Sequence, residues 1–265
     1  VIGGTGCCTH LMASIHGFWA ECVCNTVILG ERVSVNIDSD QCRPLCESVP
    51  VHENSPKNQA IATLLLAHGA GAPMDSPFMN ALVERLLSRD VAVLRFEFPY
   101  MQVRQRLGIR RPPDAQKVLL ACWRQAFEQA RQSCSGVLAM GGKSMGGRMA
   151  SLLADELGAD ALVCLGYPFY PPAKPDKPRV AHLAALKLPT LIVQGERDPM
   201  GNRQTVEGYR LSAAIRLHWL TAADHDLKPL QRSGWSHEQH LDEAASVVAG
   251  FLSAIQSADC GGRAD

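Results

Sequence analysis

Neither sign of charge is in excess in this sequence. The 265 residues include 26 lysines and arginines and 26 aspartates and glutamates, so the formal net charge is zero. Proteins that bind nucleic acid or acidic membranes usually carry a basic face. The arginines between residues 104 and 111 lack interleaved aromatic residues, and we interpret them as part of a solvated loop. We therefore expect a small-molecule partner, no nucleic acid and no membrane, and the oligomeric state stays open.

Long apolar runs are also absent. No stretch of about 18 apolar residues occurs, which is the length that a membrane-spanning helix needs. Residues 15–29 are fairly apolar, but no basic leader precedes them, and His16 and Glu21 interrupt them, so they do not fit a signal peptide. A cytoplasmic location is the resulting expectation.

The cysteine pattern does not predict a metal site. Six of the ten cysteines lie in the first 46 residues, but no Cys-x-x-Cys pair occurs among them, and structural zinc sites usually show that spacing. The sequence His-Glu-Gln-His at residues 237–240 is one residue short of the zinc motif His-Glu-x-x-His. We expect no metal and no cofactor, and we interpret Cys122, Cys134 and Cys164 as small core residues.

Three regions differ in character. Residues 1–58 are predicted to be a poorly structured or atypical extension, which ends in the linker-like stretch ENSPKNQ and holds one candidate hairpin around Gly30. Residues 59–256 are predicted to form the main domain, and residues 257–265 a flexible tail. A chain of this length supports one such domain.

Short apolar runs alternate with longer helical patterns through the main domain. The apolar runs are residues 62–67, 91–96, 137–141, 161–166, 190–195 and 215–220. The helical patterns cover residues 77–89, 114–132, 145–157, 202–211 and 237–256. Such alternation predicts an α/β fold with a mostly parallel central sheet and helices on both faces.

Polar side chains follow the apolar runs. Ligands bind beyond the carboxyl ends of the strands in sheets of this kind. The candidate substrate contacts there are His68, Tyr100 and Tyr167. A hydroxyl, a carboxylate and an imidazole follow three other runs, as Ser144, Asp198 and His225.

The stretch Gly142-Lys143-Ser144-Met145-Gly146 permits two interpretations. A phosphate-binding loop needs a glycine five positions before Gly142, but Val137 stands there inside an apolar run. A Gly-x-Ser-x-Gly elbow needs a strand before the serine and a helix after it, and both are predicted here. The segment therefore favours a nucleophilic Ser144.

A serine nucleophile needs a base, and the base needs an orienting carboxylate. In this architecture the partners follow in the order Ser, Asp, His, which Ser144, Asp198 and His225 satisfy. The backbone N–H groups of Met145 and of Ala70 or Gly71 are the expected donors to an oxyanion. These residues together predict acyl transfer.

The chain resembles the α/β-hydrolase superfamily. The stretches LLLAHGAGAPMDSPFM, RFEFPYM, GGKSMGGRMAS, LGYPF, TLIVQGERDPMG and DHDLKP carry the resemblance. More narrowly, they resemble a small, lidless bacterial group related to testis-expressed protein thirty and to the third subunit of the NSL histone-acetyltransferase complex. The resemblance implies an α/β-hydrolase fold, with Ser144 as nucleophile, Asp198 as carboxylate and His225 as base.

The resemblance leaves the substrate open. The gap between residues 166 and 190 is short and rich in proline, so we expect no large lid and a site that suits small acyl groups. The leading hypothesis is a carboxylesterase-like serine hydrolase that forms an acyl-enzyme. A thioesterase and a non-catalytic interaction protein that keeps the fold are the alternatives.

Overall fold

The computed structural model describes residues 49–261, with side chains up to residue 258. The predicted hairpin around Gly30 and the six N-terminal cysteines lie outside the described residues. Among the helices described, none is both long enough and apolar enough to cross a bilayer.

A seven-stranded sheet forms the centre of the domain, in the order β1-β3-β2-β4-β5-β6-β7. The strands are β1 (His52–Asn54), β2 (Ala62–Ala67), β3 (Val91–Phe96), β4 (Leu138–Lys143), β5 (Ala161–Leu165), β6 (Thr190–Gly195) and β7 (Ile215–Leu220). β1 runs antiparallel to β3, and every other pairing is parallel. The predicted mostly parallel α/β sheet is confirmed.

Strand β2 shows why the sheet is buried on both sides. Leu64 and Leu66 pack into one core cluster, whereas Leu65 and Ala67 pack into the other. Successive side chains of a strand point to opposite faces, so a strand covered on both faces has an unbroken apolar sequence. This is the pattern from which six of the seven strands were predicted.

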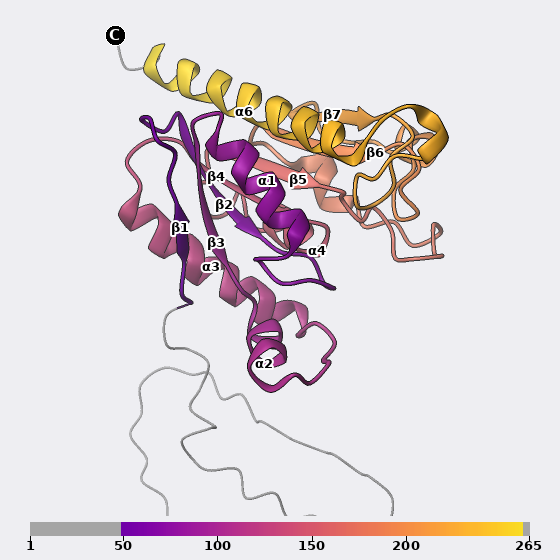
Figure 1. Cartoon of the computed structure of the whole chain (residues 1–265), viewed down its shortest axis with the longest axis horizontal. Coiled ribbons are helices and arrows are strands. Elements are labelled where there is room, and N and C mark those ends of the chain that lie inside the picture. Colours follow the sequence, from indigo (N-terminus) through magenta and orange to yellow (C-terminus); the bar gives the residue numbers. More distant parts are fainter. Residues whose placement is uncertain (1–48, 262–265) are drawn as a thin grey trace, which may run out of the picture. The chain divides into compact units, whose positions relative to one another are not determined.

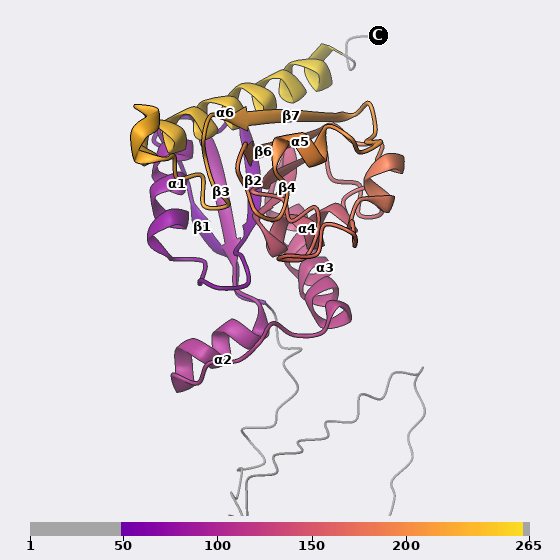
Figure 2. The same ribbon diagram turned by 90° about the vertical axis from the view of Figure 1, so that its right-hand side faces the viewer.

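Helices cover the two faces of the sheet (Figures 1 and 2). Helices α1 (Pro77–Leu87) and α6 (His237–Gly261) share one core cluster, while α3 (Gln116–Ser133) and α4 (Met145–Ser151) pack into the other. Leu119, Trp123 and Phe127 recur every four residues of α3 and form its buried stripe. The domain thus has three layers, with the sheet between two layers of helices.

Several boundaries differ from the sequence expectations. β1 lies partly in the stretch interpreted as a linker, and Val49 is in the core, so the domain begins before residue 59. β1 was not predicted because its side chains are polar. An edge strand can pair through its backbone without an apolar pattern in its sequence. At the other end α6 continues to Gly261, into the predicted flexible tail.

Two predicted helices are shorter than expected and one helix was missed. The pattern at 145–157 is helical only in α4, and the pattern at 202–211 only in α5 (Arg203–Val206). α2 (Pro99–Leu107) replaces the first part of the expected arginine-rich loop. Its signals are local: a proline in the first turn, and Gly108 in the left-handed conformation at the end.

The segment between β5 and β6 contains no large lid. Its single regular element is the short 3-10 helix η2 (Ala181–Ala185), and a second one, η3 (Gln231–Ser233), precedes α6. The prolines between residues 168 and 178 are incompatible with a helical cap. The expectation of a lidless domain is confirmed.

Candidate active site

Ser144 lies at a sharp turn between β4 and α4. Its backbone has φ 52° and ψ −115°, a conformation that costs free energy for any residue with a side chain. The turn also brings the start of α4 close to the end of β2, since a Cβ at Gly146 would lie 2.6 Å from the carbonyl oxygen of His68. The predicted strand, turn and helix are present, and the turn exposes the Ser144 hydroxyl at the rim of the sheet.

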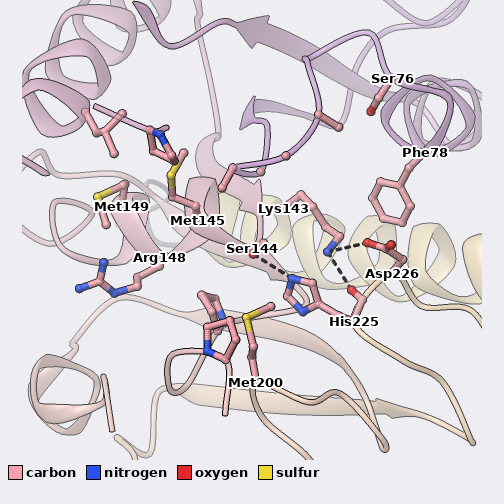
Figure 3. A pocket seen from close by; sticks show the side chains of 18 of the residues that line it. Ser76, Phe78, Lys143, Ser144, Met145, Arg148, Met149, Met200, His225 and Asp226 are labelled. Carbon is pink, nitrogen blue, oxygen red and sulfur yellow. Dashed lines mark hydrogen bonds and ion pairs between the residues drawn. The ribbon is translucent and has the colours of Figure 1, made fainter. Parts of the chain in front are cut away.

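The structure brings Ser144, His225 and Asp198 together. The Oγ of Ser144 lies 2.9 Å from Nε2 of His225, the contact drawn as a dashed line in Figure 3. On the other side of the ring, Nδ1 lies 2.7 Å from Oδ2 of Asp198. The three side chains thus form one hydrogen-bonded row, although Asp198 lies 54 positions after Ser144 and His225 lies in a third loop.

Asp198 is fully buried, and three groups of the protein donate hydrogen bonds to its carboxylate. Besides His225, its Oδ2 accepts a hydrogen bond from Nε2 of Gln194 at 2.8 Å. Its Oδ1 accepts one from the backbone N–H of Met200 at 2.7 Å. These donors hold the carboxylate in one orientation. The sequence interpretation missed Gln194, whose signal was a polar side chain at the end of an apolar strand.

The loop that carries His225 is fixed by two further residues that the sequence interpretation missed. Gly166 has φ +61°, and a Cβ there would lie 2.7 Å from the carbonyl oxygen of His225 and 3.4 Å from its Nδ1. The Nζ of Lys143 donates to the same carbonyl oxygen at 2.8 Å and pairs with Asp226 at 3.3 Å. A side chain at position 166 would therefore displace His225, and the hydrogen bond from Lys143 holds the backbone of His225 in position.

Lys143 occupies the variable position of the elbow motif, yet its environment is specific. Burial lowers its pKa, and the charges of Asp226 and Asp198 oppose that shift. Its ammonium group also lies over the ring of Phe78, 5.6 Å from the ring centre. Burial alone raises the pKa of Asp226, but the Lys143 pair outweighs it and leaves that pKa below its usual value. A lysine at the end of a buried strand was the signal in the sequence.

The predicted oxyanion donors line the cavity that contains Ser144. Met145, Ala70 and Gly71 line the same cavity as Ser144 and His225. Among the hydrogen bonds found in residues 49–261, none is donated by the backbone N–H of these three residues. An oxyanion requires N–H groups that have no partner within the protein and that face the same cavity as the nucleophile.

His68 and Tyr100 hold the loop that carries Ala70 and Gly71. The Nδ1 of His68 donates to the carbonyl oxygen of Gly69 at 2.7 Å, and its Nε2 accepts from the N–H of Phe98 at 3.1 Å. Burial lowers the pKa of His68 to about 4, so the ring is neutral at pH 7. The Tyr100 hydroxyl lies 3.2 Å and 3.1 Å from the carbonyl oxygens of Gly69 and Ala70.

The structure corrects the role expected for His68, Tyr100 and Tyr167. All three are buried, and none lines the cavity, so they do not contact a substrate bound there. Their aromatic rings pack inward because burial of so much apolar surface outweighs exposure at the strand ends. Tyr167 instead donates its N–H to Oε1 of Gln194 at 2.7 Å and so supports the partner of Asp198.

A cavity of about 760 Å³ opens above Ser144 (Figure 3). Apolar side chains form much of its wall, among them Phe78, Met79, Met145, Met149 and Met200. Its charged lining residues are Lys143, Arg148, Arg179, Asp114 and Asp226. The volume suits a small molecule.

The sheet order and the elbow define an α/β-hydrolase fold. A family model described as Alpha/beta hydrolase domain matches residues 60–253, which is most of the chain. The protein therefore belongs to this family.

Solved structures share the fold at low sequence identity. An alpha-beta serine hydrolase homologue from Coxiella burnetii is 17% identical, with a TM-score of 0.57 over 76% of this chain and 90% of that one. A serine hydrolase without a lid, XC6422 from Xanthomonas campestris, is 15% identical, with a TM-score of 0.53 over 77% and 86%. Dienelactone hydrolase from Anabaena variabilis is 22% identical, with a TM-score of 0.56 over 77% and 90%. At these identities the similarity shows the fold.

Proposed function

We propose that the protein hydrolyses an ester or a related acyl bond through an acyl-enzyme on Ser144. The observation that carries the proposal is the hydrogen-bonded row of Ser144, His225 and Asp198, with separations of 2.9 Å and 2.7 Å. Because Asp198 accepts from Nδ1–H, the lone pair of Nε2 faces the serine hydroxyl. Nε2 is thus placed to take the proton when Oγ attacks.

The reaction has two halves. In the first, Oγ of Ser144 attacks the carbonyl carbon, its proton passes to Nε2 of His225, and the alcohol leaves with that proton. In the second, water attacks the acyl-enzyme, gives a proton to Nε2, and the acid leaves as the Ser144 hydroxyl is restored. Asp198 holds the ring and stabilises the imidazolium that forms in each half.

The N–H of Met145 and that of Ala70 or Gly71 bind the developing oxyanion. Each such donor contributes about 3 kcal/mol to the stability of a transition state. Since the chain itself supplies nucleophile, base and oxyanion donors, the proposal needs no metal and no cofactor.

The open cavity and the absence of a large lid support small acyl substrates. We extend the proposal to a cytoplasmic enzyme and to kinship with the lidless group related to testis-expressed protein thirty. A thioester and an ester present the same carbonyl to Ser144, so a thioesterase is the nearest alternative.

Labelling with a fluorophosphonate probe, combined with turnover of p-nitrophenyl acetate, tests the proposal. We expect the probe to modify Ser144 and the Ser144→Ala variant to lose at least about a thousandfold in kcat. Turnover of acetyl thioesters, measured under the same conditions, shows whether the protein prefers thioesters or esters.

Ser76→Ala is the matched control, because Ser76 lines the same cavity and its side chain makes no capping hydrogen bond to α1. We expect it to keep both labelling and turnover. Undiminished turnover by Ser144→Ala would remove Ser144 from the mechanism. A wild-type protein that reacts with neither reagent would support the non-catalytic alternative.

A further inference from the structure

Two arginine side chains line the cavity without a carboxylate partner. Arg148 lies on α4, one helical turn after Ser144, and Arg179 lies in the segment between β5 and β6. Across residues 49–258, neither guanidinium forms an ion pair with a carboxylate. Partly buried charges normally have a partner of opposite sign, so this pair requires an explanation.

Arg148 is the more confined of the two. Its Nε is buried and has no hydrogen-bond partner within the described part of the chain. One terminal nitrogen contacts Oε1 of Gln116 at 3.4 Å, which is a long contact to a neutral group. No ion pair with a carboxylate of residues 49–258 therefore compensates the charge of Arg148.

The charge of Arg148 acts on two neighbouring side chains. Burial lowers the pKa of Arg179, and the charge of Arg148 lowers it further. Burial and the same charge also lower the pKa of His182. This end of the cavity thus has a positive potential that an anion would relieve.

Arg179 is held in position by its backbone. Its N–H donates to the carbonyl oxygen of Phe169 at 2.6 Å, and its own carbonyl oxygen accepts from the Tyr167 hydroxyl at 3.3 Å. His182, three residues later, lies 2.9 Å from Oγ of Ser151 through its Nε2. The bond between His182 and Ser151 connects this segment to α4. The backbones that carry Arg148 and Arg179 are therefore fixed relative to each other, and both side chains line the same cavity.

The charges that line the cavity specify the charge of the ligand. Besides His225, the lining contains three cations and two carboxylates. Lys143 and Asp226 neutralise each other at 3.3 Å. Asp114 carries the second negative charge, and its carboxylate accepts a hydrogen bond from the N–H of Tyr100 at 2.9 Å. One positive charge is left, which matches a singly charged carboxylate better than a phosphate monoester.

We propose that the substrate is an ester that carries a free carboxylate, which Arg148 and Arg179 bind while the ester carbonyl lies at Ser144. The inference rests on the hydrolase function proposed above. Arg148 lies four positions after Ser144 along α4, or roughly 6 Å along the helix axis. Figure 3 shows Arg148 on the opposite side of Ser144 from Lys143 and Asp226. The anion and the ester of a short dicarboxylic monoester would span this distance.

Binding to the Ser144→Ala protein tests the proposal without turnover. Calorimetry compares monomethyl adipate with dimethyl adipate, which differ in one charge and one methyl group. We expect the monoester to bind about tenfold more tightly at low salt, because each guanidinium donates charge-assisted hydrogen bonds. Added sodium chloride should weaken binding of the monoester and leave the diester unchanged.

Arg148→Met in the same background should reduce the preference to near unity, and Arg179→Met should reduce it in the same direction. Arg210→Met is the matched control, since Arg210 is exposed and does not line the cavity. Equal affinity for the two esters, or a preference that survives both Arg148→Met and Arg179→Met, would overturn the carboxylate site. Neither result bears on the hydrolase proposal, which is tested separately by turnover of the wild-type protein and of Ser144→Ala.

Discussion

The two ends of the cavity differ in how their charges are compensated. At the end with His225, Asp198 accepts three hydrogen bonds and Lys143 pairs with Asp226. At the end with Arg148 and Arg179, the described residues supply no carboxylate at ion-pair distance. At the first end the partners are present within the fold, whereas at the second the arginines form no ion pair with a carboxylate of the described residues.

This difference matches the two tasks that a hydrolase has to divide. Reacting groups work best when their partners are fixed before substrate arrives, because reorganisation during the reaction would cost free energy. A binding group, in contrast, contributes affinity only if its charge is not already neutralised by the protein. Variants at the two ends should therefore behave differently, and the expected effects are given from largest to smallest.

Asp198→Asn should have the largest effect. An amide at this position keeps the shape but no longer fixes Nδ1–H of His225, so Nε2 loses its lone pair toward Ser144. Substitutions of this kind lower kcat about ten-thousandfold. Steady-state kinetics with p-nitrophenyl acetate measure the loss. A drop of less than tenfold would contradict the proposed role of Asp198.

His68→Gln should change the pH dependence of stability. The pKa of His68 is about 4 in the folded state and 6.5 in the unfolded chain, so the unfolded chain binds the proton first as pH falls. Wild-type stability is thus complete above pH 6.5 and is lost as pH falls toward 4. Between pH 7 and pH 5 the titration of His68 should lower the free energy of unfolding of the wild type by about 2 kcal/mol.

Urea denaturation of both proteins at the two pH values measures this effect. The free energy of unfolding of His68→Gln should fall by about 2 kcal/mol less than that of the wild type over this interval. Parallel losses in the two proteins would mean that His68 titrates normally.

Lys143→Met should reduce kcat about tenfold, because the carbonyl oxygen of His225 loses its donor and small displacements of a base are costly. The pKa of Asp226 should rise at the same time, since burial then acts without the ion pair. Lys228→Met removes an exposed lysine from the same loop without breaking that bond and should leave kcat unchanged. Equal kinetics for the two variants would contradict the tether.

Arg179→Met should have the smallest effect on the free protein. No carboxylate among the described residues loses a partner, and the repulsion from Arg148 disappears. The free energy of unfolding should therefore change by less than about 0.5 kcal/mol. Urea denaturation without ligand measures it. A loss of several kcal/mol would show that Arg179 stabilises the fold, and would remove the contrast between the two ends.

The sequence predicted the features that are local. Apolar runs marked six strands, and the glycines around Ser144 marked the turn, because periodicity and backbone freedom act within a few residues. The order of Ser144, Asp198 and His225 predicted which residues meet. β1 was missed because its pairing with β3 depends on the backbone, and its side chains are polar.

The roles of single side chains depended on more distant neighbours. His68 and Tyr100 follow strands just as Ser144 does, yet they are buried, do not line the cavity and bond to the loop that carries Ala70 and Gly71. Lys143 was interpreted only as a variable motif position, and its tether to His225 joins residues 82 positions apart. No local pattern carries that information.

The sequence by itself determined the layered α/β fold, the elbow and the identity of the three residues proposed to react, because each follows from patterns of apolar and small residues along the chain. Tertiary structure alone decided which charged side chains of the cavity lining have a partner of opposite sign and which do not. Charge compensation depends on distances between side chains from separate elements, and only packing of the whole domain sets those distances.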